Sequence, residues 1–500
     1  MIARNILFNG IGGSWSILLY MLIVPIQIKF LGIDAFGLLA FISTLQVVYS
    51  IFDFGLSTTL AREVAIDDTP AWRQTRDLLQ TLFLAYVLIG VLLGATLILG
   101  ANWLVRHWLD LGALPASTAT TALQLAGLAI VLRWPVSFLS AVLIGRRRFD
   151  LLNLLKIGSV TLAVAGGMAV ILKTGDLVAF AAWNAVSASV EVGLYLVACF
   201  RVIPQLSLRP RLSSRAIAQI WRFARDMSII AILSTILIQS DRLLLSRLEP
   251  IDQFGYYTLA YRVLFGISLV QGFVTTAMLP AFAASFQRRA TEELSRQYLW
   301  ASQGLIFVCM PLIAALIFFG GDLLRVWTSA ATAASSAPIL VVLAPAFLLS
   351  SVLGVTATLA IAAGLTGLVI RFSGASLLLY LPGLYLAIIT WGPIGAASAW
   401  LVLNIVTFAG LLPLVQRQVI GQVRTDWLAL RLLPLVVAGS GTFGIARALL
   451  QFADWQSDVA ILIVCILAGL AYSLMGLRLL DPVLREKLWQ IFRSFRLALT

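Results

Sequence analysis

Long apolar stretches, separated by short polar segments, follow one another along almost the whole chain. Each is about 20 residues or longer, the length that an α-helix needs to cross the hydrocarbon core of a bilayer. Polar residues inside them recur at three- and four-residue intervals, which is typical of helices with one polar face. The pattern predicts about 14 transmembrane helices, over residues 6–30, 37–61, 78–101, 120–145, 152–173, 178–200, 226–247, 254–280, 300–320, 338–363, 369–391, 394–416, 430–450 and 458–478.

The composition indicates an all-α polytopic membrane protein. Hydrophobic residues make up 61% of the 500 residues, charged residues 11%, and the mean hydropathy is +0.99. An average globular protein has about 25% charged residues, so this chain could not cover a water-exposed surface with polar groups. The composition therefore excludes most classes of soluble enzyme.

Residues that bind metals or act as nucleophiles are scarce. The three cysteines, Cys199, Cys309 and Cys465, lie far apart, and His107 is the only histidine. Zinc sites and Ser-His-Asp triads need such residues in larger or more closely spaced sets. We therefore expect no cofactor, no metal and no enzymatic activity.

The net charge of +13 is better explained by the orientation of the protein in a membrane than by nucleic-acid binding. Cytoplasmic loops of membrane proteins carry an excess of Arg and Lys. With the N-terminus inside, 26 of the 35 basic residues fall in inner segments and six in outer ones. This bias predicts that both termini are cytoplasmic and that the protein has no nucleic-acid partner.

Two cytoplasmic segments stand out beside the predicted spans. Residues 201–225 are basic and are expected to carry a short surface helix that begins near Ser213. Residues 479–500 place Leu484, Leu488 and Phe492 on one helical face among basic residues. An amphipathic cationic helix of this kind suits the surface of an anionic membrane.

The chain also contains an internal repeat. Ile33-Asp34-Ala35-Phe36-Gly37 recurs 218 positions later as Ile251-Asp252-Gln253-Phe254-Gly255. Further matches follow in order at nearly the same offset: Thr58 with Thr276, Arg76 with Arg296, Gly100 with Gly320, Gly175 with Gly392, Trp183 with Trp400, and Gly193 with Gly410. An ordered series of matches indicates two related halves of six helices each.

Because six is even, both halves enter the membrane from the same side, as in parallel repeats of transporters. We expect two facing six-helix bundles with a site between them, and two further helices. The predicted parts are an N-lobe over residues 1–200, a basic linker over 201–225, a C-lobe over 226–416, helices 13 and 14 within 417–478, and the amphipathic tail over 479–500.

Ionisable side chains inside a span are costly and mark a transport pathway or a paired network. Arg133, Arg242 and Arg262 fall inside predicted spans, and they are the candidate cationic cavity for an anionic substrate. Guanidinium binds phosphate oxygens in pairs and stays charged when it is desolvated. The alternative is that each Arg pairs with an acid in its own lobe, with Glu191 or Asp53 as partners for Arg133.

The acids and polar faces complete the candidate site. Glu191, Asp53 and Asp241 are possible ion-coupling residues, although Asp53 lies near a helix end and could serve the structure instead. We expect the polar faces of two helices to line the transport pathway, through Asn9, Ser16 and Tyr20 in one helix and Thr235 and Gln239 in the other. Pro135 follows Arg133 closely and should kink that helix.

Short motifs follow one another along the chain: Leu31-Gly32, Phe36-Gly37, Phe52-Asp53-Phe54-Gly55-Leu56, and Asp241-Arg242 followed by Phe254-Gly255-Tyr256-Tyr257. Their order and spacing carry a resemblance to polysaccharide flippases of the Wzx type. It implies movement of an undecaprenyl-pyrophosphate-linked oligosaccharide across the bacterial inner membrane by alternating access, for O-antigen, capsule or exopolysaccharide biosynthesis. The implied partners are that lipid-linked substrate, membrane lipids, and polysaccharide polymerase or ligase machinery.

Other functions stay open at this stage. Multidrug exporters and the lipid II flippase belong to the same superfamily. The multidrug members commonly carry an acidic residue in helix 1, and the lipid II flippase carries Arg and acidic residues there, whereas residues 6–30 contain no acidic residue and no Arg. A membrane glycan polymerase or ligase is a further alternative. Such enzymes usually present acids or His on a large outer loop, and the repeat has no explanation in that case.

Overall fold

The computed structural model is helical, as the hydrophobic pattern predicts. It describes residues 2–66, 73–204, 208–209, 211, 213, 232, 235–455 and 457–486, with the backbone alone for residues 2–14 and 73–75. The predicted helix near Ser213 and most of the amphipathic tail lie outside these residues. The chain forms two compact units, residues 1–255 and 256–500, which are described separately.

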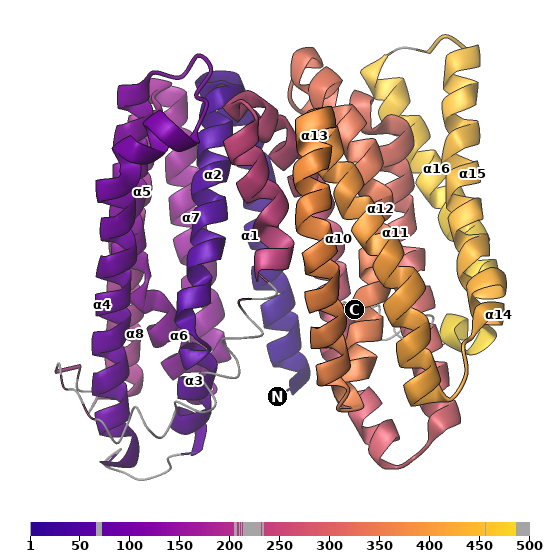
Figure 1. The fold of residues 1–500 in the computed structure, drawn as a ribbon, viewed down its shortest axis with the longest axis horizontal. Helices are drawn as coiled ribbons and strands as arrows, with labels where there is room; N and C mark the ends of the chain where they lie inside the picture. The colour runs from indigo at the N-terminus through magenta and orange to yellow at the C-terminus, as the bar shows by residue number, and fades with distance from the viewer. Residues whose placement is uncertain are drawn as a thin grey trace, which may run out of the picture. The chain divides into compact units, whose positions relative to one another are not determined.

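The helices of the first unit have the following bounds: α1 Ile2–Leu31, α2 Ile33–Tyr49, the 3₁₀ turn η1 Ser50–Asp53, α3 Leu56–Ile66, α4 Arg73–Trp103, the π-helical turn η2 Leu104–Trp108, α5 Ala116–Arg133, α6 Pro135–Gly145, α7 Phe149–Thr174 and α8 Leu177–Val202. A further helix covers 235–248. Within this unit α4 packs along α5, and α1 packs along α7 (Figure 1).

The helices of the second unit continue from α10, which starts at the end of the first: α10 Ile251–Gln287, α11 Thr291–Trp327, α12 Ala330–Ala362, α13 Thr366–Ile420, α14 Thr425–Trp427, the π-helical turn η3 Leu428–Leu432, α15 Leu433–Phe452 and α16 Asp458–Leu479. In this unit α12 packs between α11 and α13, and α15 and α16 lie against α11 (Figure 1).

Most of the predicted spans are confirmed in the described residues. Eleven helices there are long and apolar enough to cross a membrane. One of them, α13, contains two predicted spans that meet at Gly392. The described part of α1, Trp15–Leu31, is a shorter apolar helix, and the helix at 235–248 lies in the last part of the remaining predicted span.

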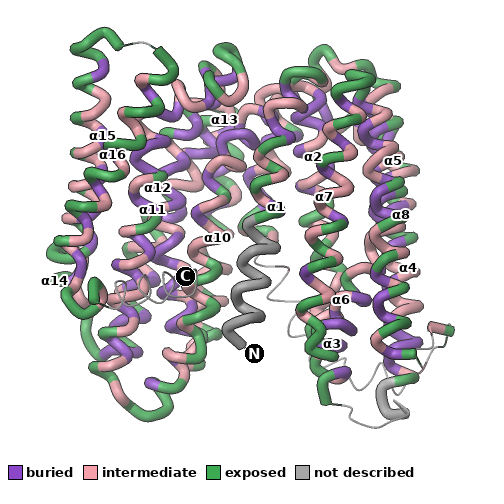
Figure 2. Tube along the Cα trace, turned by 180° about the vertical axis from the view of Figure 1, so that it is seen from behind, coloured by how far each residue is buried: buried purple, intermediate pink, exposed green. Residues whose placement is uncertain are grey.

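Exposed apolar side chains mark the surface as one that meets lipid. Leu99 is 83% exposed and Leu474 70% exposed, and both belong to long apolar helices. Figure 2 shows exposed positions along the whole length of α15 and α16. In water such a surface would be an extended hydrophobic patch, whereas in a bilayer it is the expected outer face.

The predicted span over residues 37–61 is wrong in one respect, because it is not a single helix. Helix α2 ends at Tyr49, and α3 begins only at Leu56. Between them Phe54 and Gly55 have positive φ angles of 50° and 66°, and a left-handed residue ends the helical hydrogen-bond series.

The helix is interrupted next to Pro135, where the sequence predicts a kink. Helix α5 ends at Arg133, and α6 begins at Pro135. Proline has no N–H to donate to the preceding turn, and its ring clashes with the carbonyl four residues earlier. The interruption leaves Arg133 in the last turn of α5, part-way along an apolar span.

The repeat has a structural counterpart. Gly175 has a φ of 60° and joins α7 to α8, and the matched Gly392 has a φ of 58° and joins the two arms of α13. Both glycines have a positive φ at the turn between two helices, although their ψ angles differ, at 18° for Gly175 and −136° for Gly392. Glycine adopts a positive φ without a steric penalty. The predicted lobe boundaries within 201–225 stay a prediction.

Candidate functional site

Arg133 and Glu191 form an ion pair inside the first unit. The Nε of Arg133, at the end of α5, donates a hydrogen bond to Oε2 of Glu191 on α8 over 2.7 Å. The Glu191 side chain is 17% exposed and that of Arg133 37%. Among the described residues, only the Nε of this guanidinium is engaged, so its two terminal nitrogens can bind a further anion.

Asp53 holds the break between α2 and α3 together. Its carboxylate accepts hydrogen bonds from the hydroxyl of Ser57 at 2.8 Å and from that of Tyr86 on α4 at 2.5 Å. The Ser57 N–H also reaches this carboxylate, at 3.4 Å. These contacts fit a structural role, and Arg133 pairs with Glu191 instead of Asp53.

The helix at 235–248 carries a second arginine of the candidate cavity. The guanidinium of Arg242 donates to the side-chain oxygen of Gln239 at 3.0 Å, one turn earlier. Thr235 is half-buried and Gln239 is 3% exposed. Asp241 is 2% exposed, at an angle of about 100° from Arg242 around the helix.

The predicted polar face of α1 is only partly open. Ser16 is 9% exposed, whereas Tyr20 keeps 51% of its surface accessible. The neighbouring Trp15 donates from Nε1 to the Thr161 hydroxyl at 2.9 Å and so ties α1 to α7. The side chain of Asn9 lies outside the described residues. A lining role for Asn9, Ser16 and Tyr20 stays a prediction.

Arg262 belongs to a different compact unit from Arg133 and Arg242. It belongs to α10 within the second unit and is half-buried. The other two arginines belong to the first unit. A cavity shared by all three arginines stays a prediction.

The two copies of the repeated motif pack against each other within the first unit. A Cβ on Gly37 would overlap the carbonyl oxygen of Ile251, and a Cβ on Gly255 would lie 3.1 Å from the carbonyl oxygen of Ile33. The contact is thus reciprocal: the glycine that ends each motif packs against the carbonyl group of the isoleucine that starts the other motif. Sequence reasoning found the repeat and missed this pairing.

A backbone hydrogen bond and several acidic side chains lie next to the contact between the two motifs. The Ile251 N–H donates to the carbonyl oxygen of Asp110 at 2.8 Å. The Asp34 carboxylate interacts repulsively with Asp252. Burial, and the charge of Asp252 after it, raise the pKa of Glu249 above its usual value.

The sequence of this chain matches a known protein family. The family described as polysaccharide biosynthesis protein matches residues 2–286, which is more than half of the chain. The chain belongs to this family.

Similarity beyond the family match extends over most of the chain. This chain is 21% identical over 412 residues to a putative O-antigen transporter of Shigella flexneri, and the aligned region covers 80% of this chain and 94% of that protein. The lipid II flippase MurJ in an inward closed conformation has a TM-score of 0.71 at 13% identity, over 95% of this chain and 99% of MurJ. An inward-facing MATE-family multidrug transporter has a TM-score of 0.66 at 15% identity, over 81% and 94% of the chains.

These matches confirm the resemblance inferred from the sequence motifs. This polysaccharide biosynthesis protein shares its fold with transporters of the superfamily that contains flippases and multidrug exporters. The named relatives are transporters and flippases, not enzymes. Together with the apolar helices, they establish a multi-pass membrane protein.

The second unit of this family member contains a charged cluster that sequence reasoning missed. Asp322 of α11 accepts from Arg447 of α15 at 2.6 Å, and Arg325 pairs with Asp458 of α16 at 2.7 Å. The cluster borders a pocket of about 370 Å³. The charge bias assigned both arginines to outer segments, and no local pattern indicated their partners.

Proposed function

We propose that this protein moves an undecaprenyl-pyrophosphate-linked oligosaccharide from the inner to the outer leaflet of a bacterial inner membrane by alternating access. The similarity to a putative O-antigen transporter supports the substrate class. The fold shared with a lipid II flippase supports the movement of a lipid-linked sugar. Export of this kind supplies the polymerase or ligase that builds a polysaccharide.

The observation that carries the proposal is the incompletely engaged guanidinium of Arg133. It lies within an apolar span, its Nε is bound to Glu191, and more than a third of its side chain is accessible. Pyrophosphate has several oxygens that accept paired hydrogen bonds from guanidinium. Arg242 and Arg262 are proposed as further phosphate contacts, and Tyr20, Thr235 and Gln239 as contacts to the glycan.

Glu191 is proposed as the coupling residue of this mechanism. Its carboxylate and the pyrophosphate are both anions that bind the Arg133 guanidinium, so they compete for one cation. Arrival of the substrate would release Glu191, and departure would restore the pair. A residue that alternates between a bound and a released state links the substrate to a proton or another cation.

The test distinguishes a role of Arg133 in substrate binding from a role only as the ion-pair partner of Glu191. Cells that lack the protein would receive Arg133→Gln, Glu191→Gln or both, and lipid-linked glycan would be measured separately in each leaflet. A charge-assisted hydrogen bond contributes about 1.5–3 kcal/mol, so Arg133→Gln and the double variant should reduce export about tenfold or more. Glu191→Gln should bind the lipid-linked glycan more tightly than the wild type does, because its competitor is removed.

The same set of variants gives the contradicting outcome. If Arg133 serves only as the partner of Glu191, the double variant, which has no unpaired charge, should export normally while each single variant fails. Membrane insertion of every variant, measured by the amount of folded protein, is the control. An exporter of multiple drugs would instead move dyes and leave the glycan on the cytoplasmic leaflet.

A further inference from the structure

The two arms of α13, residues 366–391 and 393–420, form a hairpin in the second unit. Gly392 turns the chain with a φ of 58° and a ψ of −136°. Close to the turn, Gly395 packs on the carbonyl of Ala387, where a Cβ would overlap that oxygen. The two glycines therefore bring the arms together at the Gly392 end.

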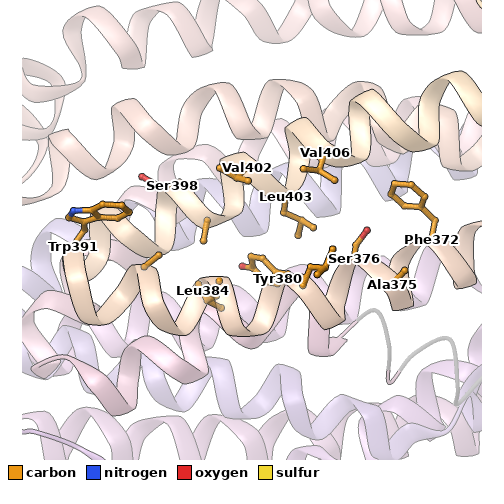
Figure 3. A pocket seen from close by; sticks show the side chains of 14 residues that line it. Phe372, Ala375, Ser376, Tyr380, Leu384, Trp391, Ser398, Val402, Leu403 and Val406 are labelled. Carbon is orange, nitrogen blue, oxygen red and sulfur yellow. The ribbon is translucent and has the colours of Figure 1, made fainter.

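A groove of about 430 Å³ lies between these arms. Figure 3 shows its lining side chains, with Trp391 at the turn and Phe372 at the far end. Most of the lining residues are apolar, and several are small, including Ala375, Gly383 and Ala399. Small side chains on facing helices leave the space open along the hairpin.

The internal repeat provides a comparison within the same chain. Gly166, Trp183 and Ala163 of the α7–α8 hairpin correspond to Gly383, Trp400 and Tyr380 at the offset of 217. In the first unit, Trp183 lies directly on Gly166, and its Nε1 donates to the Ala163 carbonyl at 3.1 Å. The indole fills the space between α7 and α8.

In the second unit the same space is open. Tyr380 replaces the small Ala163, and the Trp400 ring packs edge-on against it with centroids 6.3 Å apart. A Cβ on Gly383 would meet nothing within 4 Å. Alanine at position 163 thus accompanies a filled space between α7 and α8, and tyrosine at the matched position 380 accompanies an open groove between the arms of α13.

The groove matches the membrane in length and has a cation at one end. The helix from Phe372 to Trp391 rises about 28 Å over 19 steps of about 1.5 Å, close to the roughly 30 Å of the hydrocarbon core. Arg371 precedes Phe372 and is exposed, and its Nε is bonded to the Gly367 carbonyl at 3.2 Å. Leu379 lines the groove and is 79% exposed, so the groove opens to the surface.

We propose that this groove binds the polyisoprenoid chain of the lipid-linked substrate, with Arg371 contacting the carrier phosphate at one end. The proposal rests on the proposed function. A phospholipid acyl chain reaches only through one leaflet, or about half of the hydrocarbon core. A chain that crosses both leaflets is needed to fill the whole groove, and Arg371 supplies the complementary charge.

The first test compares two neighbouring leucines of equal exposure. A photoreactive phenylalanine analogue would replace Leu379, which lines the groove, or Leu378, which is 77% exposed and does not. The full-length protein in nanodiscs would be irradiated with labelled polyprenyl phosphate and, separately, with a labelled diacyl phosphatidylglycerol. The ratio of Leu379 to Leu378 crosslinks should be several-fold higher for polyprenyl phosphate than for the phospholipid. Equal ratios for the two lipids would overturn the proposal.

The second test fills the groove. Gly383→Leu places a side chain in it, and Gly374→Leu is the matched control on the same arm. Nine residues at about 100° each put Gly374 on the opposite helix face, and a Cβ meets nothing within 4 Å at either glycine. With the photoreactive residue at 379, Gly383→Leu should lower the polyprenyl crosslink at least several-fold, and Gly374→Leu should leave it unchanged. Equal yields in the two variants, high or low, would contradict a specific groove.

These results are distinguishable from a failure of the proposed function. Crosslinking in nanodiscs measures binding without transport. A groove that holds polyprenyl phosphate in a protein whose loss leaves glycan export intact would refute the function and retain the groove. Normal export together with no groove-specific crosslink would refute the groove and retain the function.

Discussion

Asp53 shows how one carboxylate can hold a helix break in place. It joins the start of α3 to α4 through Ser57 and Tyr86. Loss of a carboxylate that accepts at a helix start costs about 1–2 kcal/mol. Asp53→Ala should therefore lower the apparent melting temperature of the purified protein in detergent, measured by intrinsic fluorescence.

Two companion variants sharpen this prediction at the residue scale. Asp53→Asn keeps an oxygen that can accept from Ser57 and should be milder than alanine. Tyr86→Phe removes a single hydrogen bond, worth about 1 kcal/mol, and should fall between the wild type and Asp53→Ala. An Asp53→Ala protein as stable as the wild type would show that the break is held by packing alone.

At the scale of elements, the reciprocal contact of the repeated motifs joins α2 to the start of α10. A methyl group on Gly37 would collide with the backbone of Ile251, and backbone cannot move aside as a flexible side chain can. Gly37→Ala should therefore destabilise the protein and reduce glycan export. Thermal stability and leaflet-resolved glycan levels would measure both effects.

Gly100→Ala is the control for this contact. Gly100 lies in α4, and a Cβ there meets nothing within 4 Å. Because alanine is favoured over glycine by about 1 kcal/mol inside a helix, this variant should be neutral or stabilising. If both variants behave alike, the Gly37–Ile251 contact has no special importance.

At the scale of the whole molecule, the bias of 26 inner to six outer basic residues predicts cytoplasmic termini, since cationic loops stay inside. An even number of about 14 spans agrees with this orientation. A fluorescent protein fused after Thr500 should be bright, and alkaline phosphatase at the same place should be inactive. Phosphatase inserted after Gly175, between α7 and α8, should be active. The reverse pattern would invert the proposed topology.

The sequence by itself determined most of the helical spans, the interruption at Pro135 and the repeat, because each can be read from residues along the chain. Apolar length sets a span, and proline lacks an N–H wherever it stands. The pairing of Arg133 was predictable only as a choice between Glu191 and Asp53. Both acids share its lobe, and hydrophobicity does not indicate which helix faces Arg133.

Tertiary structure decided which distant side chains meet. Packing of α5 on α8 selected Glu191 for Arg133, and the break at Phe54 turned Asp53 toward Ser57 and Tyr86. The Gly37–Ile251 contact and the α13 groove likewise depend on how helices approach one another. The physical reason is that a helix forms from contacts within one turn, whereas a partner or a groove depends on residues that lie tens to hundreds of positions away.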